Sequence, residues 1–127
     1  MRYLMPNYPC EFEIPDAWLN EAGMDGFART TPTYLSRAGA ALVPLRAIEP
    51  PYRTPTQPQD WRGFDRTRLI SALKGIVVGA QIEPVLLVEQ PSGHFPPVPY
   101  RYRVCHGYHR FYASIAAGFH YLPGVIS

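Results

Sequence analysis

The stretch VCHGYHRFYASIAAGF, residues 104–119, decides how this chain is expected to fold. It reads as the end of a strand, a turn at Gly107 and a helix over 108–117, with Gly118 as its C-cap. One helix face carries large side chains at helical spacing and is predicted to point into the core: Tyr108, Phe111, Tyr112, Ile115 and Phe119. A second face places Arg110 beside small residues, Ala113, Ser114 and Ala117, and is predicted to leave room for a ligand beside the guanidinium.

The start of this helix has the chemistry of an anion site. Unpaired backbone N–H groups give a helix N-terminus partial positive charge, and a preceding glycine lets a ligand approach the backbone. Arg110 adds a planar fork that suits phosphate. His109 either donates a hydrogen bond to phosphate and acts as general acid or base, or is a surface histidine. The predicted ligand-binding residues are Gly107, Tyr108, His109, Arg110 and Ser114.

The elements around this stretch define the fold class. Asp65 is a predicted N-cap for a helix that carries an apolar stripe from Leu69 to Val77 and ends at Gly79. The apolar run over 84–89 is predicted to be a strand covered on both faces, and 100–104 a return strand. Further predicted elements are a strand over 11–14, a helix over 15–22, an edge strand over 41–48 and a final strand over 121–126, with irregular segments over 50–60 and 90–99. We therefore expect an α/β (α+β) domain, a small mixed sheet with flanking helices.

Composition narrows the function classes. The chain of 127 residues is 46% hydrophobic and 17% charged, which is typical of one globular domain. A formal charge of +2 does not favour nucleic acid as a partner, although the alternating Tyr100–Arg103 segment fits either a base-stacking platform or an amphipathic strand. No apolar run is long enough to span a membrane. With only Cys10 and Cys105, both expected to be free thiols, the predicted location is the cytoplasm.

No metal site is predicted, and the oligomeric state is left open. Cys105, His106, His109 and His120 are metal-ligand types, but their spacing does not match common structural zinc patterns. Nucleophilic catalysis by Cys105 would need a neighbouring base, which no local motif supplies.

The strand, the Gly107-x-His109-Arg110 turn, the alanine-containing helix, Gly118 and a strand near Leu122-Pro123 resemble the signature of the ParB/sulfiredoxin-like domain. The order of the upstream elements agrees: 43–50 resembles the opening strand, 64–76 the first helix and 79–88 the following turn and strand. The resemblance covers roughly residues 41–126. It divides the chain into an N-terminal extension, 1–40, which contains a short helix, and a ParB/sulfiredoxin-like domain, 41–127.

The resemblance implies a nucleotide, ATP or CTP with or without Mg²⁺, or a phosphorylated small molecule at the Gly107–Arg110 turn. It also places Glu83 near the nucleotide, so Glu83 and His109 are the candidate catalytic residues. A small phosphotransferase or NTPase is the implied enzyme type, and the sequence does not decide whether catalysis occurs. Alternatives are a DNA-associated ParB-like protein that binds or cuts DNA, and a non-catalytic interaction module.

Two departures from the family pattern limit what can be carried over. Tyr108 stands where sulfiredoxin has its catalytic cysteine, so a sulfinic-acid reductase is not expected. Tyr108 and His109 also replace the acidic residue and second arginine of partitioning ParB proteins, which argues against CTP hydrolysis. Because the sequence ends at Ser127, we expect no ParB-type helix-turn-helix to follow.

Overall fold

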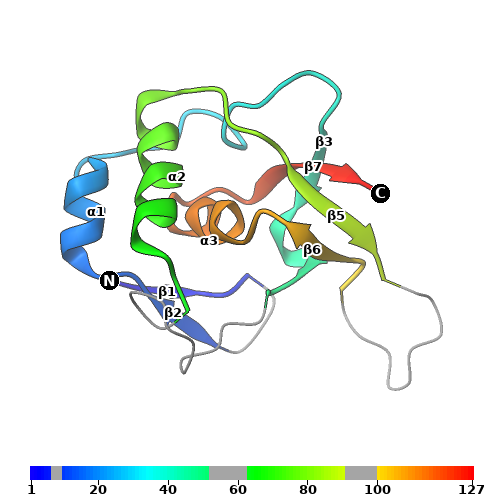
Figure 1. The fold of residues 1–127 in the computed structure, drawn as a ribbon, viewed down its shortest axis with the longest axis horizontal. Coiled ribbons are helices and arrows are strands. Elements are labelled where there is room, and N and C mark those ends of the chain that lie inside the picture. Colours follow the sequence, from blue (N-terminus) through cyan, green and yellow to red (C-terminus); the bar gives the residue numbers. More distant parts are fainter. Residues whose placement is uncertain (7–9, 52–62, 91–99) are drawn as a thin grey trace.

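The computed structural model describes residues 1–6, 10–51, 63–90 and 100–127 (Figure 1). Most of the irregular segments predicted over 50–60 and 90–99 lie outside the described residues. Three α-helices, a short 3-10 helix (η1) and seven strands follow one another within the described residues: β1 Arg2–Leu4, β2 Glu11–Glu13, α1 Asp16–Ala22, β3 Ala41–Pro44, η1 Leu45–Ala47, β4 Ile48–Glu49, α2 Arg66–Val78, β5 Val85–Glu89, β6 Tyr102–His106, α3 Tyr108–Ala116 and β7 Tyr121–Ile126.

The main sheet has five strands in the order β3-β7-β5-β6-β4, and β1 pairs with β2 in a separate antiparallel ribbon. β5 runs parallel to β7 and antiparallel to β6, so the sheet is mixed. The described residues therefore form a small mixed sheet with flanking helices, which confirms the predicted fold class.

The predicted edge strand over 41–48 is divided in the structure. β3 does lie at one edge of the sheet, where it pairs only with β7, as the proline at position 44 led us to expect. η1 then turns the chain, and β4 pairs with β6 at the opposite edge. One short segment thus supplies both edges, because the sheet curls between them. The return strand is also displaced by two residues from its predicted bounds, to Tyr102–His106.

α2 forms as its end signals predict. The Asp65 carboxylate accepts a hydrogen bond from the Arg68 N–H at 2.9 Å, which caps the helix, and Gly79 ends it in the left-handed conformation. Leu69, Ile70, Leu73 and Ile76 are buried along one stripe of this helix. On β5, Val85 and Leu87 are fully buried whereas Leu86 and Val88 are half-buried, so one face of the strand is covered completely.

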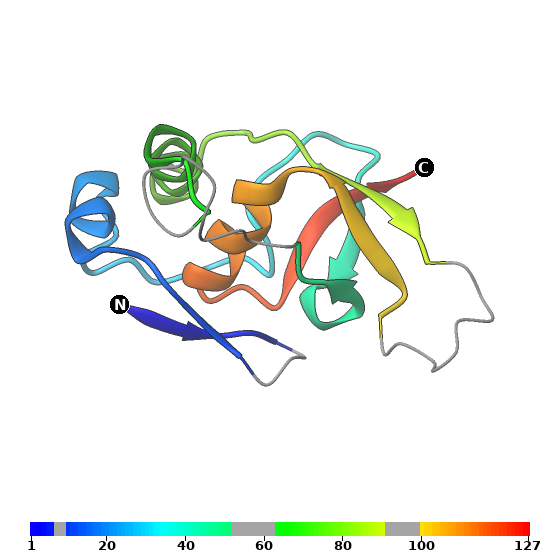
Figure 2. The same ribbon diagram turned by 60° about the horizontal axis from the view of Figure 1, so that its bottom comes forward.

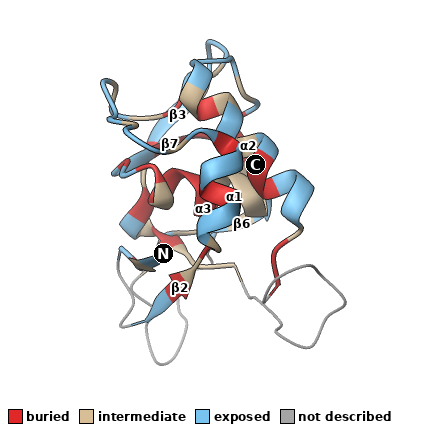
Figure 3. Ribbon diagram, turned by 90° about the vertical axis from the view of Figure 1, so that its left-hand side faces the viewer, coloured by how far each residue is buried: buried red, intermediate tan, exposed pale blue. Residues whose placement is uncertain are grey.

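α3 lies at the centre of the molecule, between the sheet and the α1–α2 pair (Figure 2). Phe111, Tyr112, Ile115 and Phe119 are buried as predicted, and Tyr108 is half-buried. The expected open face beside Arg110 is wrong. Ala113 and Ser114 have no exposed surface and Ala117 is 8% exposed, so this face of α3 is covered as well (buried residues are red in Figure 3). The Ser114 hydroxyl donates to the Arg110 carbonyl at 2.8 Å inside the helix.

The residues before position 41 share the core of the sheet domain. Phe12, Ile14, Trp18, Leu19 and Tyr34 belong to the same cluster of buried side chains as the sheet and α3. α1 forms as predicted, with Gly23 as its left-handed C-cap. The pairing of β2 with β1 was not predicted, because three residues of β1 carry too little pattern to be recognised. The extension therefore packs on the domain, and the boundary at position 41 stays a prediction.

Candidate functional site

A cleft of about 1060 Å³ runs between α2 and the turn that joins β6 to α3. One wall is the side of α2 from Thr67 to Gly75, and the opposite wall is the segment from Val104 to Arg110. Residues 81–83, which follow α2, also line the cleft, as do Gly63 and Pro51. The N-termini of α2 and α3 therefore border the same space.

The structure brings five of the six predicted site residues to this cleft. Glu83, Gly107, Tyr108, His109 and Arg110 all line it. Ser114 does not, because it is fully buried and its hydroxyl is used inside α3. The predicted residues that meet here come from α3, its preceding turn and the segment before β5.

Gly107 is the N-cap of α3 and adopts a φ of +120°, a conformation that other residues rarely adopt. A Cβ atom at this position would lie 3.0 Å from both methyl groups of Val85 and 3.3 Å from its Cα. Glycine is therefore required at this position for two reasons, the positive φ of the turn and the close approach to β5. This fit holds the N-terminus of α3 against the sheet, where the first turn of the helix borders the cleft.

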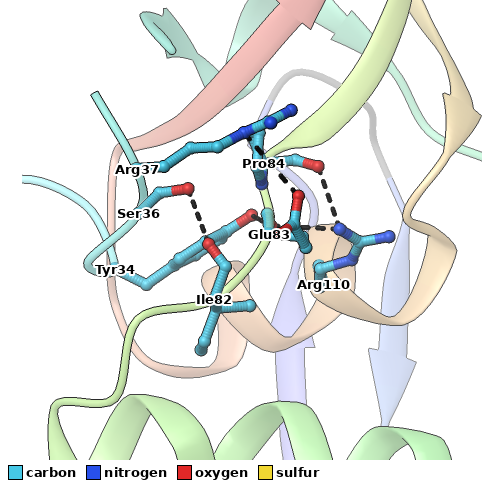
Figure 4. Close-up of polar contacts among 7 residues, drawn as sticks. All are labelled: Tyr34, Ser36, Arg37, Ile82, Glu83, Pro84 and Arg110. Atoms are coloured by element: carbon cyan, nitrogen blue, oxygen red, sulfur yellow. Dashed lines mark hydrogen bonds and ion pairs between the residues drawn. The ribbon is translucent and has the colours of Figure 1, made fainter. Parts of the chain in front are cut away.

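Arg110 is held by backbone carbonyls (Figure 4). Its Nη1 donates to the carbonyl oxygen of Glu83 at 3.0 Å and to that of Pro84 at 2.9 Å. These acceptors use both hydrogens of Nη1 and carry no formal charge, so the positive charge of the guanidinium is not neutralised by them. Nε and Nη2 form the remaining edge, which is the pair that binds a phosphate or carboxylate in bidentate fashion.

Glu83 is exposed, and its carboxylate Oε2 lies 3.7 Å from Nε of Arg37. At that distance the pair is a loose ion pair in solvent and contributes little to stability. The backbone carbonyl of Glu83 has a better-defined role, because it accepts hydrogen bonds from Arg110 and from the Tyr34 hydroxyl. Glu83, a predicted catalytic residue, thus lines the cleft, while its carboxylate already faces the Arg37 guanidinium.

His109 links the two helices that form the cleft. Its Nε2 accepts a hydrogen bond from the backbone N–H of Asp65 at 3.0 Å, which assigns the ring proton to Nδ1 in the neutral form. Burial is the main cause that holds the pKa of His109 below its ordinary value of 6.5; the Asp65 carboxylate opposes this shift and the Arg68 guanidinium adds to it. The ring is therefore a neutral acceptor at Nε2 near pH 7, and Nδ1–H is its one donor.

This geometry predicts that stability falls with acidification. Because the pKa of His109 is lower in the folded state than in the unfolded chain, the unfolded state binds more protons between the two values. The stabilisation is fully present above about pH 6.5 and is lost as the pH falls through the folded pKa. Urea unfolding from about pH 5 to about pH 8 measures the effect. His109→Gln keeps an acceptor but does not titrate, so its stability should vary less with pH.

His120→Gln is the matched control, since His120 is exposed and lies just before β7. It should follow the wild-type pH profile. Equal pH profiles for wild type and His109→Gln would show that the contact with Asp65 does not control protonation of the ring.

The α2 wall contains functional candidates that the sequence analysis missed. Thr67, Arg68 and Ser71 line the cleft, together with Ala72 and Gly75. These residues recur about once per helical turn on a face of α2 other than the buried stripe. That pattern in the sequence could have indicated them as candidates. Arg68 is exposed in the first turn of α2, and it adds a second arginine to the cleft, on the wall opposite Arg110.

Cys105 and His106 also line the cleft, and both are exposed. Cys10 and Cys105 are free thiols, as the sequence led us to expect. Among the described residues, no group of three or more His, Cys, Asp or Glu side chains is arranged to hold a metal ion. None of the helices in the described ranges is both long and apolar enough to cross a membrane.

Comparison with known proteins adds no assignment. No protein-family model matches the sequence, and a search of curated proteins found no significant match.

Proposed function

We propose that the cleft binds a phosphate-bearing ligand, with a nucleotide as the favoured class. The observation that carries this proposal is the state of Arg110. Two neutral carbonyls hold its Nη1, while Nε and Nη2 have no hydrogen-bond or ion-pair partner among the described residues, and Arg110 lines the cleft. A positioned, charged, planar fork of this kind is suited to the paired oxygens of a phosphate group.

The surroundings of Arg110 support an anionic ligand. The first turn of α3 borders the same cleft and offers backbone N–H groups and partial positive charge. Gly107 has no side chain to cover this helix end, and Arg68 adds a second positive charge across the cleft. A cleft of about 1060 Å³ has room for a nucleotide such as ATP or CTP, with or without Mg²⁺.

His109 fits a binding role better than proton transfer within this proposal. Its Nε2 is occupied by the Asp65 N–H, and burial lowers its pKa, so the imidazolium needed for a general acid is disfavoured at neutral pH. Nδ1–H is the group it can offer to a phosphate oxygen. A phosphotransferase or NTPase reaction would then depend on Glu83 as the cleft's candidate base, and we propose ligand binding without assigning a reaction.

The ParB/sulfiredoxin-like identity also stays a proposal. It is supported by the order β3, α2, β5, β6, α3, β7 and by the glycine turn that leads into α3. We propose a cytoplasmic location on the grounds of the two free thiols.

Calorimetric titration with ATP, CTP and inorganic pyrophosphate, with and without Mg²⁺, tests the proposal. At least one should bind wild type, and Arg68→Gln should weaken its affinity by about fivefold, the effect of losing roughly 1 kcal/mol from an exposed charge contact. Arg103→Gln is the matched control, because Arg103 is exposed on β6 and does not line the cleft.

Two other results would each favour a different function for this protein. Salt-sensitive binding of duplex DNA without nucleotide binding would favour the DNA-associated alternative. Failure of every phosphate ligand and of DNA to bind folded wild type would favour an interaction module.

A further inference from the structure

The segment Tyr34–Arg37, here called the clamp, holds a second segment, which contributes to the lining of the cleft. That segment is the connector, Ile82–Pro84, which lies between α2 and β5 and includes the cleft-lining residues Ile82 and Glu83 (Figure 4). The Ile82 N–H donates to the Leu35 carbonyl at 2.8 Å, and the Ser36 hydroxyl donates to the Ile82 carbonyl at 2.6 Å. The clamp thus fixes the backbone of the connector although the two segments are far apart in sequence.

Tyr34 and Arg110 meet at a single atom of the connector. The Tyr34 hydroxyl donates to the Glu83 carbonyl oxygen at 2.8 Å, and Arg110 Nη1 donates to the same oxygen at 3.0 Å. Two lone pairs allow a carbonyl oxygen to accept both bonds. Tyr34 is only 3% exposed, and burial raises the pKa of its hydroxyl above the ordinary value of 10.0. The hydroxyl is therefore a fixed donor throughout the physiological pH range.

From this shared acceptor we infer that Tyr34 is a positioning residue for Arg110. The hydroxyl fixes the Glu83 carbonyl, and the Glu83 and Pro84 carbonyls together fix Nη1, so the Nε–Nη2 edge keeps one orientation at the cleft. In Figure 4 the Arg110 nitrogens other than Nη1 point away from the connector. The clamp lies outside the region of family resemblance, so this role is additional to anything the resemblance implies.

The consequence for the ligand rests on the proposed function. A guanidinium held in one orientation loses less rotational freedom when it binds, so a bidentate anion gains most from the clamp. Phosphate and pyrophosphate present paired oxygens, whereas a monatomic anion gains nothing from the orientation of the fork. Tyr34 would thereby favour phosphate groups over simple anions such as chloride.

Tyr34→Phe removes the hydroxyl and keeps the buried ring. Heteronuclear NMR of the ligand-free protein reports the rate of rotation about the Cζ–Nη1 bond of Arg110. We expect slow rotation in wild type, compared with the exposed Arg103, and at least severalfold faster rotation in Tyr34→Phe. Titration with inorganic pyrophosphate should show about fivefold weaker binding for the variant, which corresponds to the loss of one hydrogen bond of roughly 1 kcal/mol.

Ser36→Ala is the matched control, because it removes the hydroxyl that donates to the Ile82 carbonyl but leaves the shared Glu83 oxygen untouched. It should preserve slow rotation in Arg110. Equal effects of Tyr34→Phe and Ser36→Ala would overturn a specific role for Tyr34, as would wild-type rotation and wild-type affinity in a folded Tyr34→Phe.

The two readouts separate this inference from the proposed function. If wild type binds none of ATP, CTP and pyrophosphate, the proposed function fails while the rotation measurement still tests the positioning of Arg110. If Tyr34→Phe does not fold, wild type alone decides: Arg110 rotation as fast as that of Arg103 would overturn the inference.

Discussion

Gly107→Ala is expected to lower the free energy of unfolding by about 3 kcal/mol or more, the sum of backbone strain and overpacking. The strain arises because φ at this position is +120°, and the overpacking because the new Cβ would lie 3.0 Å from both Val85 methyl carbons. Thermal unfolding should show a decrease in Tm of roughly 10 °C. The same change should misplace the first turn of α3 and so weaken any ligand that the turn binds.

Gly39→Ala is the matched control for the part of the cost that comes from backbone strain. Gly39 also has a positive φ, +94°, but a Cβ there would meet no heavy atom within 4 Å. Its cost should be limited to about 1–2 kcal/mol of left-handed strain. Val85→Ala removes the two methyl groups, so the cost of Gly107→Ala should be smaller in that background. If Gly107→Ala costs no more than Gly39→Ala, the close packing of the turn on β5 is not present in solution.

Arg110→Lys is expected to reduce the affinity of the proposed site for nucleotide or pyrophosphate by about tenfold to a hundredfold. That range corresponds to roughly 1.5–3 kcal/mol for hydrogen bonds made by a charged group. Lysine retains the positive charge but has no planar fork, so it cannot satisfy the Glu83 and Pro84 carbonyls and also present a bidentate edge. Calorimetric titration of the folded variant measures the loss.

Arg103→Lys is the matched comparison for Arg110→Lys. The same exchange at Arg103, which is exposed on β6, should leave the affinity within about twofold of the wild-type value. Unchanged affinity in Arg110→Lys would mean that charge alone, without the geometry of the fork, accounts for binding. Equal losses in both variants would point to a diffuse electrostatic effect rather than to the cleft.

Much of the fold follows from local sequence signals. α2 has an N-cap, an apolar stripe and a glycine C-cap within one continuous segment, and the structure reproduces all three. The division of 41–48 between two sheet edges was not predictable, because it depends on how the whole sheet curls. The burial of Ala113 and Ser114 was missed for a related reason. Small residues pack equally well against a neighbouring element or beside an open site, and only the tertiary position of α3 decides which.

The candidate site, too, was predictable from the sequence only in part. The Gly107–Arg110 turn was predictable because its residues are adjacent in sequence and share the chemistry of a helix N-terminus. The contacts that fix these side chains were not predictable from the sequence. His109 meets the Asp65 N–H across 44 positions, and Tyr34 meets the Glu83 carbonyl across 49. In each of these hydrogen bonds, one of the two groups belongs to the backbone. The partner of a backbone group depends on the fold rather than on residue type.

The most direct test of the central claim is an amide NMR titration of wild type with ATP and CTP, each with and without Mg²⁺. We predict saturable shifts in the backbone signals of Tyr108, His109 and Arg110, because the N-terminus of α3 borders the cleft, with smaller shifts along α2 from Thr67 to Ser71. Shifts confined to surfaces away from the cleft, or no shifts with any nucleotide, would contradict a phosphate site at this turn.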